Sequence, residues 1–200
     1  MTHLFIYRLT SDTGLAPCVD NGLLSLAVCK GGQIRNGKPC HWGLRHQIGR
    51  DYSKNLINDP VYILGTYKDE FLYLARVEEV LTMEEYFRDR SAGRTDNIYS
   101  LRNGKLVRNN RLQKEQRHTN EDENVRDLAG VYVLLSKNFI YRGKDTVSID
   151  LLKEKGPKFQ GHKHIVGKEA EKIIKACEKY RDNILHVPHE PLTKKCGVRK

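Results

Sequence analysis

Short apolar runs separated by polar turns make up most of the hydrophobic pattern of this chain. Leu4 to Leu9, Leu23 to Cys29, Val61 to Thr66 and Phe71 to Val80 are rich in aliphatic and aromatic side chains and contain few strand-breaking residues. The polar turn Tyr67 to Glu70 separates the last two runs, which predicts an antiparallel hairpin. The pattern therefore predicts that a β-sheet forms the core.

Two segments have a helical pattern. Thr82 and Glu85 have the spacing of a capping box within an apolar stripe, so a helix is predicted to begin at Thr82 and to end near Arg90. Apolar residues fall on one face of the segment Lys168 to Tyr180, which predicts an amphipathic helix. The segment Trp42 to Lys54 fits a short helix and a loop equally well.

A second hairpin is predicted from the runs Val131 to Leu135 and Phe139 to Tyr141. Hairpins with few helices between them favour an α+β fold, built on a strongly bent and mostly antiparallel sheet with a few flanking helices. No internal repeat divides the 200 residues, so we expect a single domain over residues 1–200.

A long polar segment, at about residues 91–126, interrupts the pattern and is too long for an ordinary connection. The chain has 35 Lys and Arg against 25 Asp and Glu, a net charge of +10, and the excess is concentrated between Arg88 and Arg117. We therefore expect this basic loop or insertion to contact the phosphates of a nucleic acid, although a solvated polar loop produces the same pattern. A basic tail from about residue 186 adds to the charge.

Missing motifs argue against several classes of protein. The chain has no Gly-x-x-x-x-Gly-Lys-Ser/Thr loop and no Gly-x-Gly-x-x-Gly after a strand, so neither a P-loop nucleotidase nor a dinucleotide enzyme is supported. The sequence does not identify a cofactor. Its apolar runs are far shorter than the roughly 20 residues that span a bilayer, so we expect no membrane insertion. The five cysteines form no Cys-x-x-Cys pair and the start does not resemble a signal peptide, which favours a reduced cytoplasmic location. Cys29, Cys40, His41 and His46 lack the spacing of zinc ligands, so no metal site is predicted.

Two segments near the start of the chain supply candidate catalytic groups. Asp12, Thr13 and Gly14 predict a tight turn that presents a carboxylate and a hydroxyl. Cys29 lies at the expected end of a strand beside Lys30, and a neighbouring cation lowers the pKa of a thiol. The thiol is therefore either a nucleophile or a small buried group that finishes the strand.

Two later segments supply further candidates. His162 and Lys163 lie in an expected loop, where imidazole and ammonium groups suit proton transfer or phosphate binding, or form a basic loop only. The segment 96–99 combines a carboxylate, an amide and a ring that can recognise a base, or forms an Asx turn anchored by a buried aromatic. The candidate residues are Asp12, Cys29 and His162 as catalytic groups, and Thr13, Lys30, Arg35, Asp96, Asn97, Tyr99 and Lys163 as groups that bind a nucleotide or nucleic acid.

Seven short segments have an order and spacing that point to a known family. They are Asp12-Thr13-Gly14-x-Ala16-Pro17, the strand end Leu26-Ala27-x-Cys29-Lys30 with Ile34-Arg35, Asp59-x-Val61-x-Ile63-x-Gly65-Thr66, Ala75-x-Val77-x-Glu79-Val80-Leu81-Thr82-x-x-Glu85-Tyr86, Asp96-Asn97-Ile98-Tyr99, Val133-Leu134-x-Ser136-x-x-Phe139-x-Tyr141-x-Gly143, and Gly161-His162-Lys163. Over most of the chain they resemble the nucleotide modification associated domain 2 family, which is found in phages and bacteria. The resemblance implies a role in the modification of nucleic-acid bases and leaves the reaction open.

The resemblance leads to one function hypothesis and two alternatives. The protein is expected to bind a nucleotide or an extruded base in a basic pocket at the strand ends, with DNA favoured, and whether it catalyses a modification step stays open. The alternatives are a non-catalytic reader of modified DNA or RNA bases, and a phage or defence accessory protein that binds a protein partner. In the enzymatic version the roles are proton transfer by Asp12 or His162, phosphate binding by Lys30, Arg35 and Lys163, and base stacking by Tyr99.

The strand that begins at Asp59, its hairpin partner and the helix at Thr82 follow one another in the order seen in the PUA, ASCH and EVE barrels. Those barrels bind nucleic acids and modified bases in a small basin. By this fold-level analogy the bent sheet is expected to approach a barrel.

Overall fold

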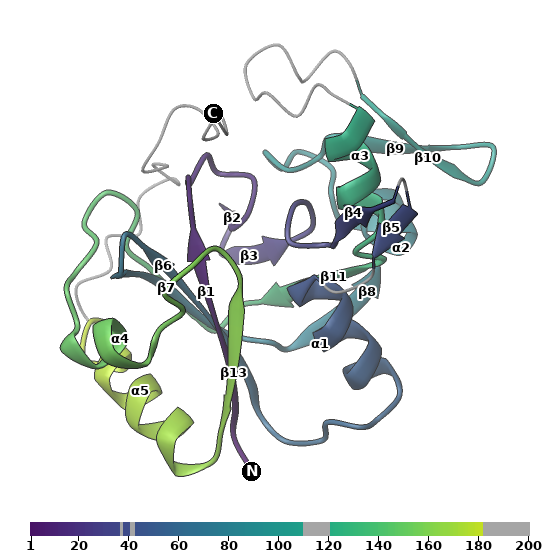
Figure 1. Ribbon diagram of the computed structural model, residues 1–200. Coiled ribbons are helices and arrows are strands. Elements are labelled where there is room, and N and C mark those ends of the chain that lie inside the picture. Colours follow the sequence, from purple (N-terminus) through teal and green to yellow (C-terminus); the bar gives the residue numbers. More distant parts are fainter. Residues whose placement is uncertain (37, 41–42, 110–120, 182–200) are drawn as a thin grey trace.

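Two β-sheets packed against each other form the centre of the computed structural model, which describes residues 1–36, 38–40, 43–109 and 121–181 (Figure 1). The first sheet consists, in spatial order, of β12 (Phe139–Tyr141), β7 (Glu70–Arg76), β6 (Val61–Tyr67), β1 (His3–Leu9) and β13 (His162–Val166). Strands β1 and β6 run parallel, whereas the other three neighbouring pairs are antiparallel.

The second sheet is antiparallel, and its strands run across those of the first sheet in Figure 1. It consists, in spatial order, of β2 (Cys18–Asp20), β3 (Leu23–Leu26), β11 (Tyr132–Ser136) and β8 (Glu79–Thr82). Two separate hairpins accompany the sheets, namely β4 (Gln33–Arg35) with β5 (Lys38–Cys40), and β9 (Tyr99–Arg102) with β10 (Lys105–Arg108).

Helices flank both sheets. Within the described residues they are α1 (Leu44–Ser53), α2 (Met83–Asp89), α3 (Glu121–Leu128), α4 (Asp150–Lys155) and α5 (Lys168–Glu178). Helices α4 and α5 cover the face of the first sheet that points away from the second sheet. Among the described helices, none combines the length and the apolar character needed to cross a membrane.

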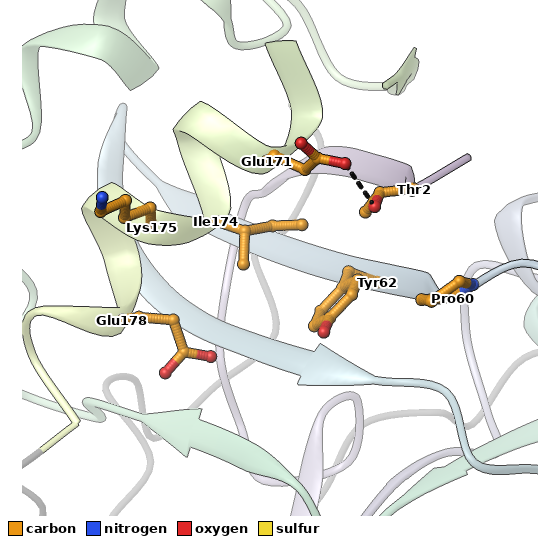
Figure 2. A pocket seen from close by; sticks show the side chains of 7 residues that line it. All are labelled: Thr2, Pro60, Tyr62, Glu171, Ile174, Lys175 and Glu178. Atoms are coloured by element: carbon orange, nitrogen blue, oxygen red, sulfur yellow. Dashed lines mark hydrogen bonds between the residues drawn. The ribbon is translucent and has the colours of Figure 1, made fainter. Parts of the chain in front are cut away.

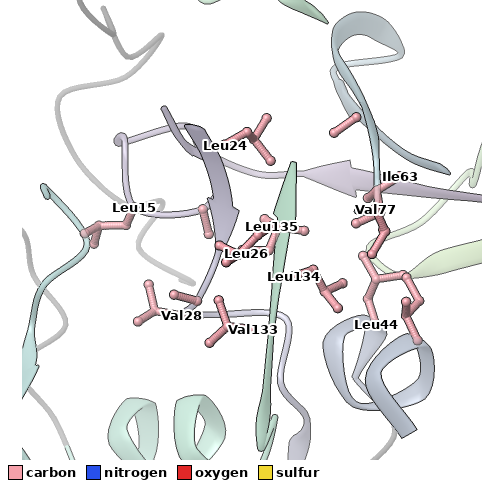
Figure 3. Close-up of a cluster of buried hydrophobic side chains, with 14 of the residues drawn as sticks. Leu15, Leu24, Leu26, Val28, Leu44, Ile63, Val77, Val133, Leu134 and Leu135 are labelled. Carbon is pink, nitrogen blue, oxygen red and sulfur yellow. The ribbon is translucent and has the colours of Figure 1, made fainter. Parts of the chain in front are cut away.

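Strand β1 is buried on both faces, which explains its unbroken apolar run. Leu4 and Ile6 belong to a hydrophobic cluster with residues of α4 and α5, whereas Phe5 and Tyr7 belong to the cluster that the two sheets share. This division follows from the alternation of side chains along a strand. Figure 3 shows part of the shared cluster, where Leu26 of β3 lies beside Leu135 of β11.

The chain passes directly from one sheet to the other at two places, and these crossings bend the structure strongly. Two residues separate β7 from β8, and two separate β11 from β12. The Glu78 carboxylate joins the crossings, because its Oε2 accepts hydrogen bonds from the backbone N–H groups of Lys137 (2.6 Å) and Asn138 (3.1 Å). The predicted hairpin of β11 and β12 is therefore wrong, since β11 pairs with β3 and β8, and β12 pairs with β7.

The α+β class, with its bent and mostly antiparallel sheets and flanking helices, is confirmed. The sheets do not close into a barrel within the described residues, in contrast to the PUA, ASCH and EVE analogy. The capping box of α2 is present, because the Glu85 N–H donates to Thr82 Oγ1 (3.2 Å) and the Thr82 N–H donates to Glu85 Oε2 (2.7 Å). Most of the ambiguous segment from residue 42 to 54 forms α1.

The polar segment at residues 91–126 contains more regular structure than its sequence pattern predicts. The β9–β10 hairpin and the first turns of α3 lie within it. Residues 110–120 and the basic tail from about residue 186 lie outside the described residues. The expected loop at His162 is also regular, because it forms the edge strand β13.

A fully buried arginine holds several distant segments together. Arg45, in the first turn of α1, donates hydrogen bonds from its guanidinium to the backbone carbonyls of Cys29 (2.6 Å), Asp127 (2.7 Å) and Tyr132. Its own backbone N–H donates to the Lys30 carbonyl at 3.2 Å. Because a buried cation is costly unless its donors are satisfied, these carbonyls fix where the four segments meet.

We expect Arg45→Ala to lower the free energy of unfolding by about 3 kcal/mol or more, because the substitution leaves buried carbonyls without donors and opens a cavity. Urea denaturation measures the loss. Arg50→Ala is the matched control on the same helix: Arg50 is exposed and pairs with its neighbour Asp51, so its removal leaves the free energy of unfolding nearly unchanged. Equal stability of the two variants would contradict the central role of Arg45.

Candidate functional site

Four of the predicted site residues meet around Tyr7, near the C-terminal end of β1. Lys30 Nζ lies 5.4 Å from the centre of the Tyr7 ring, and His162 is directly opposite Tyr7 on the neighbouring strand β13. Burial raises the pKa of the Tyr7 phenol, and negative charge on Asp12 or Cys29 raises it further, so both groups lie near it. We call this group of residues the Tyr7 cluster. It comprises Tyr7, Asp12, Cys29, Lys30, Tyr73, Tyr141 and His162.

Two phenols form the buried base of the Tyr7 cluster. The Tyr73 hydroxyl donates a hydrogen bond to the Tyr7 hydroxyl at 2.7 Å, and both side chains are almost completely buried. Burial raises the pKa of both phenols far above the ordinary value, and the negative charge of Asp12 raises it further. Both hydroxyls therefore remain protonated at neutral pH.

Asp12 is fully buried in the loop that follows β1. Its Oδ2 accepts a hydrogen bond from the half-buried Tyr141 hydroxyl at 2.5 Å, and its Oδ1 accepts one from the Gly14 N–H at 3.4 Å. Gly14 has a φ of 82°, as the predicted tight turn requires. Thr13 lies next to Asp12 and is half-buried. The loop thus holds a carboxylate against the ends of β1 and β12.

Cys29 and Lys30 have an unusual backbone conformation. Their φ angles are 55° and 49°, in the left-handed region that residues with a side chain rarely adopt. The Cys29 N–H donates to Asp127 Oδ1 at 2.6 Å, and the Arg45 contacts hold the two carbonyls. Strained backbone of this kind persists where surrounding contacts enforce it, and it is concentrated at functional sites.

Tyr99 supports the same loop from inside. Its hydroxyl donates to Asp127 Oδ2 at 3.1 Å, so one carboxylate links Tyr99 to the Cys29 backbone. The Tyr99 side chain is almost completely buried and packs edge-on against Phe87. The ring predicted to stack on a base is therefore part of the support beneath the Tyr7 cluster.

His162 and Lys163 point to opposite faces of the first sheet. His162 shares the face of Tyr7, where its Nε2 lies 2.9 Å from Gln47 Oε1 of α1. Burial lowers the pKa of the His162 imidazole, which favours the neutral ring. Lys163 pairs with Ile6, on the face covered by α4, and its Nζ donates to the Lys155 carbonyl at 3.1 Å. The structure brings His162, but not Lys163, to the Tyr7 cluster.

Asp96 lies in a separate buried network beside the second sheet, and the neighbouring Asn97 accepts a hydrogen bond from Ser91 Oγ at 2.9 Å. Asp96 accepts hydrogen bonds from Ser25 Oγ (2.5 Å) and the Tyr86 hydroxyl (2.8 Å), and its carboxylate forms an ion pair with Arg94 at 3.4 Å. Burial raises the pKa of Asp96, while Ser25 and Arg94 oppose that effect. This network ties the start of the polar segment to β3, so Asp96 lies in the interior.

The positive charge predicted for phosphate contact is dispersed in the structure. Arg88 and Arg90 pair with neighbouring carboxylates, and Arg94 is buried. Arg102 and Lys105 are exposed near the turn of the β9–β10 hairpin, which projects from the body of the protein in Figure 1. Among the described residues of the segment, the exposed part of this charge therefore lies on the hairpin and on Arg88 and Arg90, which are paired with carboxylates.

Some of the predicted phosphate-binding groups lie outside the described residues. They are three basic residues between Arg88 and Arg117, and the side chain of Arg35. Arg35 lies on β4 opposite Lys38 of β5, but its side chain lies outside the described part. Arg111, Lys114 and Arg117 fall within residues 110–120.

Sequence reasoning missed the three tyrosines of the Tyr7 cluster. Tyr7 and Tyr73 lie within apolar strand runs, where an aromatic residue predicts only a place in the core. Tyr141 belongs to a segment of the family resemblance, and that was the available signal for it. Arg45 and Asp127 were missed because charged residues are expected at the surface.

Two surface hollows lie at the opposite end of the first sheet from the Tyr7 cluster. One has a volume of about 340 Å³ and lies between α5 and the start of β6 (Figure 2). The other, of about 260 Å³, lies beside Asp59 and Arg76. Neither hollow includes a predicted site residue, so they do not define the candidate site.

The lowered pKa of His162 predicts a dependence of stability on pH. The unfolded chain takes up this proton near the ordinary histidine pKa of about 6.5, whereas the folded chain does so only at lower pH. The free energy of unfolding is therefore expected to fall as the pH drops below about 6.5. Urea denaturation of His162→Gln should show a smaller fall, and Lys163→Gln, the control on the same strand, should match the unchanged protein. An identical fall in His162→Gln would contradict this assignment.

One of three comparisons with known proteins found a match. A search of curated proteins and a search of solved structures each found no match. The family model described as nucleotide modification associated domain 2 matches residues 1–195. This match includes the Tyr7 cluster, the β9–β10 hairpin and the loop supported by Arg45. The chain belongs to the nucleotide modification associated domain 2 family.

Proposed function

We propose that this protein binds a nucleotide, or a base turned out of a nucleic acid, at the Tyr7 cluster and takes part in the modification of that base. Membership of the family relates the chain to nucleotide modification. The observation that best supports the proposal is the meeting of a carboxylate, a cation, a thiol and an imidazole at one end of β1. These groups come from three separate segments of the chain.

The chemistry of the cluster suits base recognition and proton transfer. A base turned out of its stack presents donors and acceptors on its edge, which hydroxyl and carboxylate groups can bind. In our proposal Asp12 or the neutral His162 accepts a proton, and Lys30 contacts a phosphate. The protonated phenols of Tyr7 and Tyr141 donate hydrogen bonds. Cys29 is held beside these groups, and in our proposal its thiol is the candidate nucleophile.

The support beneath the cluster favours a preorganised site. Arg45 and Asp127 hold the Cys29–Lys30 backbone through three hydrogen bonds. Groups fixed before a ligand arrives need little reorganisation on binding, which favours both affinity and catalysis. We propose DNA as the nucleic acid and the cytoplasm as the location, with the exposed charge of the β9–β10 hairpin as a further phosphate contact.

The decisive experiment compares nucleosides by mass spectrometry in host DNA and tRNA, with and without expression of the chain. An enzyme produces a nucleoside of new mass, and Asp12→Asn is expected to reduce its rate of formation about 100-fold or more. Asp150→Asn is the matched control, since its side chain is exposed on α4. Lys30→Met tests the same site at a half-exposed position.

The outcomes separate the alternatives. If no new mass is formed but the protein binds modified DNA or RNA tightly, and Lys30→Met weakens that binding, the protein is a reader that uses the same site. If Asp12→Asn and Lys30→Met both keep full activity and affinity while remaining folded, the assignment of the site is wrong. If the unchanged chain binds no nucleic acid at low salt, an accessory protein with a protein partner is the better interpretation.

Binding to DNA is expected to weaken steeply with salt, and the β9–β10 hairpin is expected to contribute to the steepness. The double variant Arg102→Ala with Lys105→Ala should reduce the slope of log affinity against log salt by about 2, because each phosphate contact contributes about 0.9. Fluorescence anisotropy at several salt concentrations measures the slope. Lys168→Ala with Lys172→Ala removes the same charge from α5 and should leave the slope nearly unchanged. Equal slopes for both double variants would exclude the hairpin as a contact.

A further inference from the structure

An exposed aromatic side chain stands out on the loop between α4 and β13. Phe159 is 84% exposed, the highest value among the large hydrophobic side chains that are exposed in the described residues. Most large aromatic side chains of a folded protein are at least partly buried, because exposing so much apolar surface is unfavourable. An aromatic side chain held in solvent therefore needs a separate explanation.

The loop that presents Phe159 is anchored on both sides. The Arg8 N–H donates to the Gly161 carbonyl at 3.3 Å, and Arg8 Nη1 donates to the Lys158 carbonyl at 2.9 Å. Lys158 Nζ in turn donates to the Lys153 carbonyl at the end of α4. These contacts fix the backbone on either side of Phe159, so the ring is presented from a defined position.

The position of Phe159 is close in the chain to the Tyr7 cluster. Gly161 bonds to Arg8, the residue after Tyr7, and His162 pairs with Tyr7 itself. The loop therefore lies at the same end of the first sheet as the Asp12 loop. Leu56, the next most exposed of these side chains apart from the terminal Met1, precedes β6 and lies at the opposite end of that sheet.

The sequence on either side of Phe159 is rich in lysine. Residues 153–163 contain four lysines and one glutamate, and Lys158 and Lys163 are both exposed. An aromatic ring among cations is the combination that binds single-stranded nucleic acids, since the ring stacks on a base while the cations contact the backbone. A protein partner that bound the ring through apolar contacts alone would not require these lysines.

We propose that Phe159 stacks on an unpaired base of a nucleic-acid strand whose neighbouring nucleotide occupies the Tyr7 cluster. The inference rests on the proposed function and adds a defined contact to it. Phe159 is a binding residue in this account and takes no part in the chemistry. The ring holds the nucleic-acid strand next to the Tyr7 cluster. It therefore increases the affinity for single-stranded or locally opened nucleic acid.

Fluorescence anisotropy with a fluorescein-labelled single-stranded oligodeoxynucleotide of mixed sequence tests the proposal. Phe159→Ala is expected to weaken binding about tenfold, since stacking on an aromatic ring contributes strongly for each base. The salt dependence should remain the same, because no charge is removed. Lys158→Ala is expected to reduce the salt slope by about 1. Leu56→Ala, which removes an exposed apolar side chain at the other end of the sheet, should bind like the unchanged protein.

A fluorescent variant provides a direct readout of stacking. Phe159→Trp adds a second tryptophan to a chain that has one, Trp42. Its additional emission should be quenched when the oligonucleotide binds, and its affinity should equal or exceed that of the unchanged protein.

The outcomes distinguish this inference from the proposed function. If the unchanged protein binds the oligonucleotide, but Phe159→Ala binds equally well and Phe159→Trp shows no quenching, the inference is wrong and the proposed function stands. If the unchanged protein binds neither the single strand nor a duplex with a mismatch at low salt, both are wrong. A loss of affinity in Phe159→Ala that Phe159→Trp restores would establish the stacking contact.

Discussion

The buried guanidinium of Arg45 is the constraint on which the interior depends. Its donors bind carbonyls from the loop after β3, from the end of α3 and from β11, and these segments lie far apart in the sequence. A buried cation is tolerated only when its hydrogen-bonding groups are satisfied, so the three segments must come together for the charge to be buried at all. The left-handed conformation of Cys29 and Lys30 follows from this requirement rather than from local sequence preference.

The candidate site combines this fixed loop with a strand end. Strand β1 is buried on both faces over most of its length, and Tyr7 lies near its C-terminal end, before the loop that holds the buried Asp12. A hydrophobic strand of this kind positions its last residues with little freedom, since shifting it by one residue would exchange its two faces. The carboxylate, the phenols and the lysine thus occupy defined positions relative to one another.

Local patterns in the sequence predicted those parts of the fold that depend on local interactions. The apolar run of β1, the capping box of α2 and the stripe of α5 are confirmed, because each reflects a period or a cap within one segment. The partner of β11 could not be predicted, since it depends on Glu78 and on the crossing between sheets. Strand β13 was missed because its alternating histidine and lysine residues look like a polar loop. Of the candidate site, the sequence located Asp12, Cys29, Lys30 and His162, whereas the contribution of Tyr7 required the register of two strands.

The two crossings between the sheets have a consequence for how the protein could be divided. Because β7 continues into β8 and β11 into β12, each sheet contains strands from both halves of the chain, and Glu78 fastens one crossing to the other. The strands of the two sheets therefore alternate along the chain. A cut at either crossing leaves the strands of the first sheet divided between two fragments.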